Sequence, residues 1–367
     1  MCCYSGKVSL PPLQPVPPEL YHLLTDHHDP RAKAFRDEIR NYNNALAMTS
    51  VGRQVDHSLN NGGGPWVFKL HGQLTHRIGS LLPRPVSTPS FAQLYIYDTE
   101  YALQCRMARP VNFGLQQHVL RELQDMLYRC HPAVRLYKQA WELTAHLPLD
   151  HHCTISLHFD ENCDRRRYNE PDASVKEISV ILPGEGDEIK QSQDIILSRK
   201  DGPLQRMSDL HPLYPSLRYV LLFPTGQLGW HDHLPYKDVE DEPHGRRQLQ
   251  QTRMYISMAE FHRYRLFIRP VLAESQHLFL TGKLFQEYVC ETWAISEQNR
   301  LNFIKSNQKL LRVELYQGLA DAVAADADAD WNQLGKRYIL PSSFTGSTCR
   351  MPLPSTDSME EGTSLSL

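Results

Sequence analysis

The hydrophobic period of this chain changes twice along its length, and this pattern constrains the fold more than any other feature. In residues 115–129 and 132–144, apolar residues recur every three or four positions, which is typical of amphipathic helices. Residues 154–159, 175–182, 194–198 and 218–223 instead follow a period of two and predict short strands separated by turns. From residue 257 onward the helical character returns. The sequence therefore predicts an α+β fold, with a central, mostly antiparallel sheet, flanking helices and a following helical segment.

Local composition predicts five segments. Residues 1–30 are proline-rich and predict an extended lead, because proline fixes its own backbone and disfavours helix in the residue before it. Residues 31–235 form the predicted α+β domain, which also includes a helix over 30–49 and strands at 66–70 and 93–97. Residues 236–255 are a polar linker, and residues 256–348 are the helical segment. Residues 349–367 lack periodicity and are rich in Ser, Thr, Pro and acidic residues, so we expect them to be disordered.

The overall composition excludes several classes of protein. The chain has 367 residues, of which 41% are hydrophobic and 22% charged, so a collagen-like, fully disordered or disulfide-dense secreted protein is excluded. We expect no membrane span and no secretory signal. Eight cysteines are scattered without a Cys-x-x-Cys pair, which favours free thiols over a zinc site. We therefore expect a nuclear or otherwise intracellular, reducing location.

Motifs for catalysis and cofactor binding are incomplete in this sequence. The nearest approach to a phosphate-binding loop, residues 281–284, has His277 in place of the first glycine and Leu284 in place of the hydroxyl residue. The His231-Asp232-His233 triplet lies in a turn context and favours a solvated loop over a metal site. Tyr97 and Tyr101 have the spacing of two phenols on one helical face, but the residues before Tyr97 predict a strand, which favours a packing role for Tyr97 over a nucleophilic pair. We therefore predict no catalytic residue, no metal ligand and no cofactor in this chain. A self-contained enzyme stays open as an alternative that nuclease and ATPase assays would test.

The positive signal is a basic window at residues 246–316. It contains eleven basic and six acidic residues, a net charge of +5, while the whole chain carries −3. Residues 261–269 interleave arginines, whose fork can donate two hydrogen bonds to a phosphate, with aromatic rings on which bases can stack. Further on, basic residues recur at helical spacing of four and three. The candidate DNA-phosphate contacts are Arg263, Arg265, Arg269, Lys305, Lys309 and Arg312. The alternative is that these are the solvated faces of amphipathic helices.

Nine stretches of the sequence, in order along the chain, resemble one known family. They are residues 6–13, 72–81, 91–98, 219–224, 229–231, 261–264, 297–301, 314–318 and 340–347. Together they resemble the N-terminal region of Helitron transposases, the proteins of rolling-circle DNA transposons, including their Helitron helicase-like domain.

The resemblance implies a DNA-binding role but carries over no catalytic residue. In the family, a nuclease with paired histidines, a divalent metal and attacking tyrosines follows the stretch that matches residues 341–347, and an ATP-dependent helicase comes later still. This chain departs from the family pattern at about Cys349. The resemblance therefore implies a transposase fragment that ends before the nuclease and binds single-stranded or transposon-end DNA. A protein-interaction or scaffold module without DNA affinity stays open as the alternative, and the sequence leaves the oligomeric state undetermined.

Overall fold

A computed structural model of the protein describes residues 3, 6–52, 75–78, 80–83, 87–145, 154–159, 178–181, 194–198, 205–208, 210–232, 234–237, 254–269 and 277–307. The chain divides into two compact units. The first contains Met1–Arg53 and Leu74–Thr292, and the second contains Gln54–Gln73 and Trp293–Leu367. None of the described helices combines the length and the apolar character that crossing a bilayer requires.

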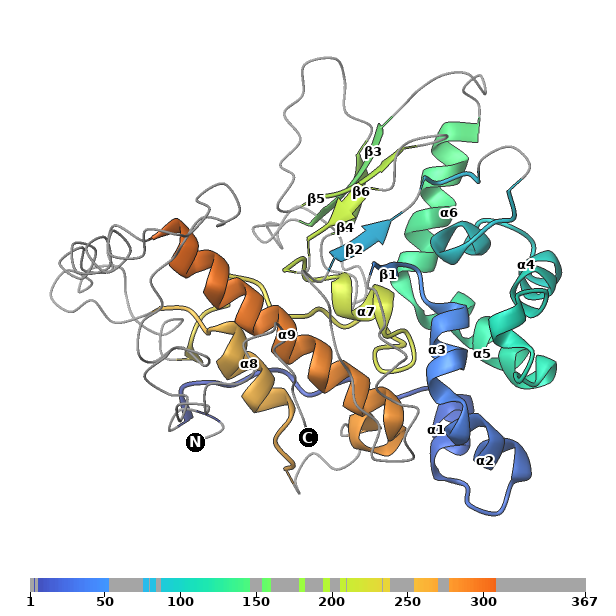
Figure 1. Ribbon diagram of the computed structural model, residues 1–367, viewed down its shortest axis with the longest axis horizontal. Coiled ribbons are helices and arrows are strands. Elements are labelled where there is room, and N and C mark those ends of the chain that lie inside the picture. The colour runs from blue at the N-terminus through green and yellow to red at the C-terminus, as the bar shows by residue number, and fades with distance from the viewer. Residues whose placement is uncertain are drawn as a thin grey trace, which may run out of the picture. The chain divides into compact units, whose positions relative to one another are not determined.

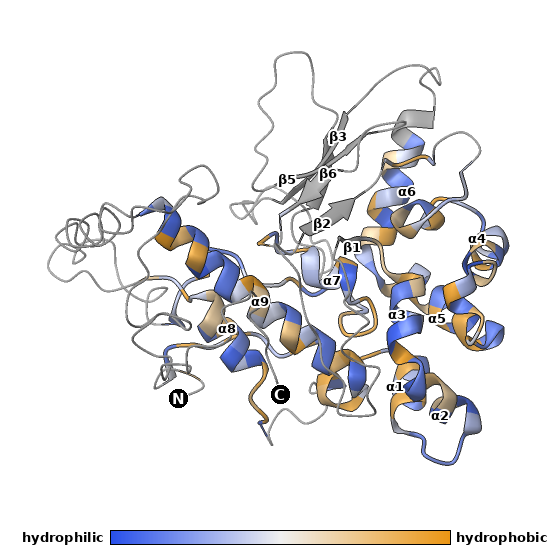
Figure 2. Ribbon diagram, in the orientation of Figure 1, coloured by the Kyte–Doolittle hydropathy of each residue, from blue (hydrophilic) through white to orange (hydrophobic). Residues whose placement is uncertain are grey.

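Helices build the core of the first unit (Figure 1). They include α1 (Pro18–Thr25), α2 (Pro30–Asp37), α3 (Ile39–Leu46), α4 (Thr99–Met107), α5 (Gln117–Cys130) and α6 (Pro132–Ala145). Helix α5 contacts α1, α4 and α6. Figure 2 shows that apolar and polar residues both occur on these helices, and many of the apolar side chains are buried. Fully buried examples, each at most 1% exposed, are Leu20, Phe35, Leu46, Leu103, Val119, Leu123 and Tyr137.

Shorter elements complete the described part of the chain. The 3-10 helices are η3 (Phe91–Tyr95), η4 (Pro110–Asn112) and η7 (His277–Thr281), and the remaining α-helices are α7 (Tyr214–Arg218), α8 (Met258–Arg265) and α9 (Lys283–Ser306). The strands are β1 (Ser50–Gly52), β2 (Thr75–Ile78), β3 (Thr154–Phe159), β4 (Ile178–Ile181), β5 (Asp194–Ser198) and β6 (Gln205–Met207). They pair antiparallel in two three-stranded sheets, in the orders β1-β2-β6 and β4-β3-β5.

The predicted α+β fold around a central sheet is wrong. Among the residues whose side chains the structure describes, helices account for 61% and strands for 1%. The buried apolar side chains come from helices and from the loops that join them. Strands β3, β4 and β5 do fall within ranges for which the sequence predicts strands, but they do not form the core on which the chain is built.

Two predicted strands are helical or turn segments instead. Residues 93–97 lie mostly in η3, where Ser90 and Gln93 form a capping box: each side chain bonds the other residue's backbone N–H. Of residues 218–223, Arg218 ends α7 and the others continue in a series of turns. The side chains of Tyr219, Val220, Leu221 and Leu222 are each at most 1% exposed. Periodicity cannot distinguish a short, fully buried apolar run in a strand from one in another backbone conformation.

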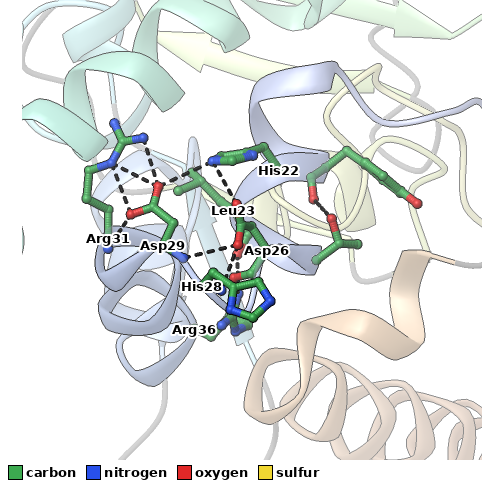
Figure 3. Close-up of polar contacts among 9 residues, drawn as sticks. His22, Leu23, Asp26, His28, Asp29, Arg31 and Arg36 are labelled. Carbon is green, nitrogen blue, oxygen red and sulfur yellow. Dashed lines mark hydrogen bonds and ion pairs between the residues drawn. The ribbon is translucent and has the colours of Figure 1, made fainter.

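Charged side chains fix the turn between α1 and α2 (Figure 3). The Asp29 carboxylate accepts from the backbone N–H of Arg31 at 2.8 Å and so caps α2. Hydrogen bonds from Arg31 lower the pKa of Asp29 to about 2. The Arg36 guanidinium donates to the backbone oxygens of Leu23 and Asp26, at 3.0 and 2.8 Å. It therefore satisfies carbonyls at the C-terminal end of α1 that have no partner within the helix.

The proline-rich lead is part of the folded core. Helix α1 begins at Pro18, so the segment without helix is shorter than the 30 residues that the sequence predicts as extended. Val8, Leu10, Leu13 and Val16 are between 2% and 8% exposed. Val8 and Leu10 join one apolar cluster with Tyr236, Ile256 and Phe261. The apolar side chains between the prolines thus attach the lead to the region that contains α8.

Candidate nucleic-acid interface

The basic window begins at α8, whose start is fixed by a reciprocal cap. Ser257 precedes the helix, and its hydroxyl accepts from the backbone N–H of Glu260 at 3.3 Å. The Glu260 carboxylate in turn accepts from the Ser257 backbone N–H at 2.8 Å and from the Tyr236 hydroxyl at 3.0 Å. The capping box therefore engages the single acidic residue of α8 at the start of the helix, where the helix dipole favours negative charge.

One side of α8 is buried. Arg265, four residues after Phe261, lies on that same side, whereas Arg263 is exposed. Met258 and Phe261 are 6% and 4% exposed, and Trp230 supports the segment before the helix by donating its indole N–H to the Ile256 oxygen at 2.8 Å. Residues 263–269, which we call the arginine segment, run from the last turn of α8 into the residues that follow. Helical spacing thus fixes which side chains face away from the core.

The arginines of the arginine segment differ in how they are held. Arg263 is exposed. Arg265 is partly buried: its Nη1 donates to the Pro11 oxygen at 2.5 Å, and its guanidinium carbon lies 5.5 Å from the centre of the Phe261 ring. Burial lowers the pKa of Arg265 from its ordinary value, but a guanidinium stays charged at neutral pH. Arg263 is thus an exposed cation, whereas Arg265 is held by a hydrogen bond and a ring contact.

Arg269 packs against aromatic rings. Its guanidinium carbon lies 3.7 Å from the centre of the Tyr264 ring and 5.4 Å from that of Phe267, which is cation–π geometry. Its Nη1 also donates to the backbone oxygens of Tyr264 and Phe267, at 2.5 and 3.0 Å. Phe267 is 51% exposed and Ile268 is 63% exposed. A fixed guanidinium thus lies next to an aromatic ring that solvent can reach.

The three arginines of the arginine segment, Arg263, Arg265 and Arg269, have no carboxylate partner among the residues that the structure describes. Burial lowers the pKa of His262 to about 4, so this neighbouring ring is neutral at pH 7. Other arginines do pair with carboxylates: Arg31 with Asp29, Arg121 with Glu100, Arg129 with Glu19, Arg218 with Glu287 and Arg300 with Glu297.

Comparison with known families gives a match that begins inside α8. Residues 261–359 match the family described as the Helitron helicase-like domain at the N-terminus. The chain carries a Helitron helicase-like segment. This match confirms the resemblance predicted from the sequence, and it includes all six candidate DNA-contacting residues. No curated protein matches the chain.

The structure groups three of the six candidate residues of the Helitron helicase-like segment. Arg263, Arg265 and Arg269 lie within seven consecutive residues, at the end of α8 and just after it. Lys305 is exposed in the last turn of α9 and belongs to the second unit. Lys309 and Arg312 lie outside the described residues. The predicted basic stripe of Lys305, Lys309 and Arg312 is therefore untested and stays a prediction.

Two other features of the sequence can be compared with the described residues. Among the described residues, no three His, Cys, Asp or Glu side chains come together as a metal site. Tyr97 and Tyr101 have ring centres 5.4 Å apart, but Tyr97 precedes α4 and its Asp98 cap. Their rings contact each other in a tilted arrangement, and Tyr101 is 45% exposed.

One partner of the Helitron helicase-like segment could not be found from the sequence. This partner is the backbone oxygen of Pro11, which lies 254 positions before Arg265. The residues around Pro11 do not indicate which distant side chain donates to that oxygen. The aromatic neighbours Tyr264 and Phe267 could be found, because they alternate with the arginines in one continuous stretch.

Proposed function

We propose that this chain is a Helitron transposase-related polypeptide that binds single-stranded or transposon-end DNA through the arginine segment. The single observation that supports this most is that Arg263, Arg265 and Arg269 have no carboxylate partner among the described residues. Guanidiniums without a described carboxylate partner, one of which (Arg269) lies beside the exposed Phe267 ring, match the two needs of a nucleic-acid strand, which are phosphate neutralisation and base stacking.

The proposal assigns Lys305, Lys309 and Arg312 to further phosphate contacts. It assigns no catalytic step, metal or nucleotide to the residues of this chain. Incubation of the chain with Mg²⁺ or Mn²⁺ and ATP should then yield neither strand cleavage nor ATP hydrolysis.

Salt dependence tests the proposal directly. Binding of a fluorescently labelled single strand by the full chain is measured by anisotropy at several salt concentrations. Each lost phosphate contact on a single strand should reduce the slope of log K against log salt by about 0.7, so the triple variant Arg263→Ala, Arg265→Ala, Arg269→Ala should reduce it by about 2.

A matched control removes the same charge from arginines that already pair with carboxylates. The triple variant Arg31→Ala, Arg121→Ala, Arg129→Ala should keep the wild-type slope. Equal slopes for the wild type and the arginine-segment variant, with circular dichroism showing both proteins folded, would refute the assignment.

A protein-interaction module without DNA affinity is the second candidate, and one observation favours it. Val111 and Phe113, in and after η4, are 76% and 74% exposed, although the buried Asn112 side chain anchors this turn by donating to the Arg106 oxygen at 2.8 Å. Large apolar side chains held out from a rigid turn are typical of contact surfaces. This candidate predicts no anisotropy change with labelled strands at low salt.

A further inference from the structure

The lead segment, residues 7–13, packs its apolar side chains against α8. Leu10 is 6% exposed and belongs to the same apolar cluster as Phe261 of α8. Leu13 is 7% exposed and lines a small cavity with Phe261 and Arg265. Leu10 and Leu13, three positions apart in the lead segment, therefore both reach the buried side of α8 near Phe261.

Hydrogen bonds join the same segment to its surroundings at both ends. The Lys237 backbone N–H donates to the Lys7 oxygen at 3.0 Å, and Arg265 donates to the Pro11 oxygen at 2.5 Å. An extended proline-rich segment makes no hydrogen bonds within itself, so its carbonyls are available to outside donors. The Arg265 guanidinium has five N–H groups, so a bond to Pro11 leaves others for a ligand.

We propose that the lead segment is a positioning element for the arginine segment. By accepting from Arg265 and packing under Phe261, it holds the last turn of α8 and the guanidinium of Arg265 in the orientation that binds phosphate. Removing the contact lowers DNA affinity while the charge of the interface is unchanged. This inference rests on the proposed DNA-binding function and adds residues 7–13 to the elements that set its affinity.

The test uses Arg265→Lys in the full chain. Lysine keeps the positive charge but lacks the planar fork that bonds Pro11 while lying beside Phe261. Hydrogen–deuterium exchange is measured for the amides of residues 7–13, and single-strand affinity is measured at several salt concentrations. We expect faster exchange in the lead segment and binding about threefold to tenfold weaker, with an unchanged salt slope because the charge is retained.

Arg36→Lys is the matched control. Arg36 also donates to backbone oxygens, those of Leu23 and Asp26, but it lies in α2, outside the arginine segment. We expect it to change neither lead-segment exchange nor DNA affinity. A second pair of variants tests the apolar contact instead of the hydrogen bond. Leu10→Ala should weaken DNA binding, because Leu10 packs in the cluster around Phe261. Leu23→Ala should not, because Leu23 is also buried but lies outside that cluster.

Each result has a distinct meaning. Faster exchange in Arg265→Lys with unchanged affinity would refute the positioning role and leave the DNA-binding proposal standing. Unchanged exchange would refute the contact between the lead segment and Arg265. A wild-type chain that binds no strand even at low salt would refute the proposed function itself, and the positioning role with it.

Discussion

His131 lies buried just before α6, and both of its ring nitrogens have partners. The Ala133 backbone N–H donates to Nδ1 at 3.2 Å, and Nε2 lies 3.2 Å from the Ser216 oxygen. This pattern suits the neutral ring with its proton on Nε2. Burial lowers the pKa of His131 from 6.5 to about 4, because the charged form loses its hydration.

Protonation of His131 should therefore oppose folding in mild acid. Below pH 6.5 the unfolded chain takes up a proton that the folded chain refuses until about pH 4, so stability falls as the pH falls through this window. The loss from this residue between pH 7 and 4.5 should be about 2–3 kcal/mol. Urea unfolding followed by circular dichroism at the two pH values measures it.

His131→Gln provides the comparison, because it keeps a side-chain donor and cannot titrate. Its unfolding free energy should change less between pH 7 and 4.5 than that of the wild type. Burial also lowers the pKa of His262 to about 4, so His262 accounts for part of the pH dependence of the unfolding free energy that His131→Gln retains. An equal pH dependence in both proteins would show that His131 does not contribute.

Among the elements, the loop after α7 meets the start of α6 at Gly226. This glycine has φ of 73°, in the left-handed region that side chains disfavour, and a Cβ added there would lie 2.4 Å from Cγ of Pro132. Gly226→Ala should therefore lower the unfolding free energy by about 2–4 kcal/mol, combining backbone strain with a clash against a rigid ring. Urea denaturation gives the value.

Gly114→Ala is the control for the same chemical change. Nothing lies within 4 Å of a Cβ at Gly114 and its φ is not in the left-handed region, so the variant should stay within about 0.5 kcal/mol of the wild type. Equal stabilities of the two variants would mean that the loop adapts to a side chain at Gly226.

The sequence predicts the described helices better than the strands, for reasons of length and burial. Residues 115–129 and 132–144 each repeat their apolar stripe over about four turns, and α5 and α6 lie there with one or two residues of difference at their ends. The segment 93–97 is too short for a strand period of two residues to be distinguished from a helical period of 3.6. The capping-box pair Ser90 and Gln93 was the available signal for a helical start.

At the scale of the whole molecule, some features of the candidate interface could be predicted from the sequence and others could not. Continuous features, such as the alternating arginines and rings of residues 263–269, can be read directly from the sequence. Contacts between distant segments cannot: Arg265 with Pro11, or Arg218 with Glu287, join positions whose proximity depends on how the helices pack. The predicted central sheet failed for this reason, since short apolar runs do not reveal what covers them.

A buried polar network attaches the first half of α9 to α7. Arg218 Nη2 lies 2.7 Å from Glu287 Oε1, and these side chains are 5% and 4% exposed. One turn further along α9, Glu291 accepts from the hydroxyls of Tyr214 and Tyr219, the latter at 2.6 Å. Charges this deeply buried depend on their partners, because neither can recover its hydration while the chain stays folded.

Glu287→Ala should consequently destabilise the fold by about 3–5 kcal/mol, since it leaves the Arg218 guanidinium buried without its carboxylate. Glu297→Ala, on the same helix, breaks the more exposed pair with Arg300 at 2.8 Å and should change stability by less than about 1 kcal/mol. Thermal unfolding followed by circular dichroism compares the two. If both variants melt within a degree or two of the wild type, the pair does not hold α9 to α7, and apolar packing alone must join this helix to the core.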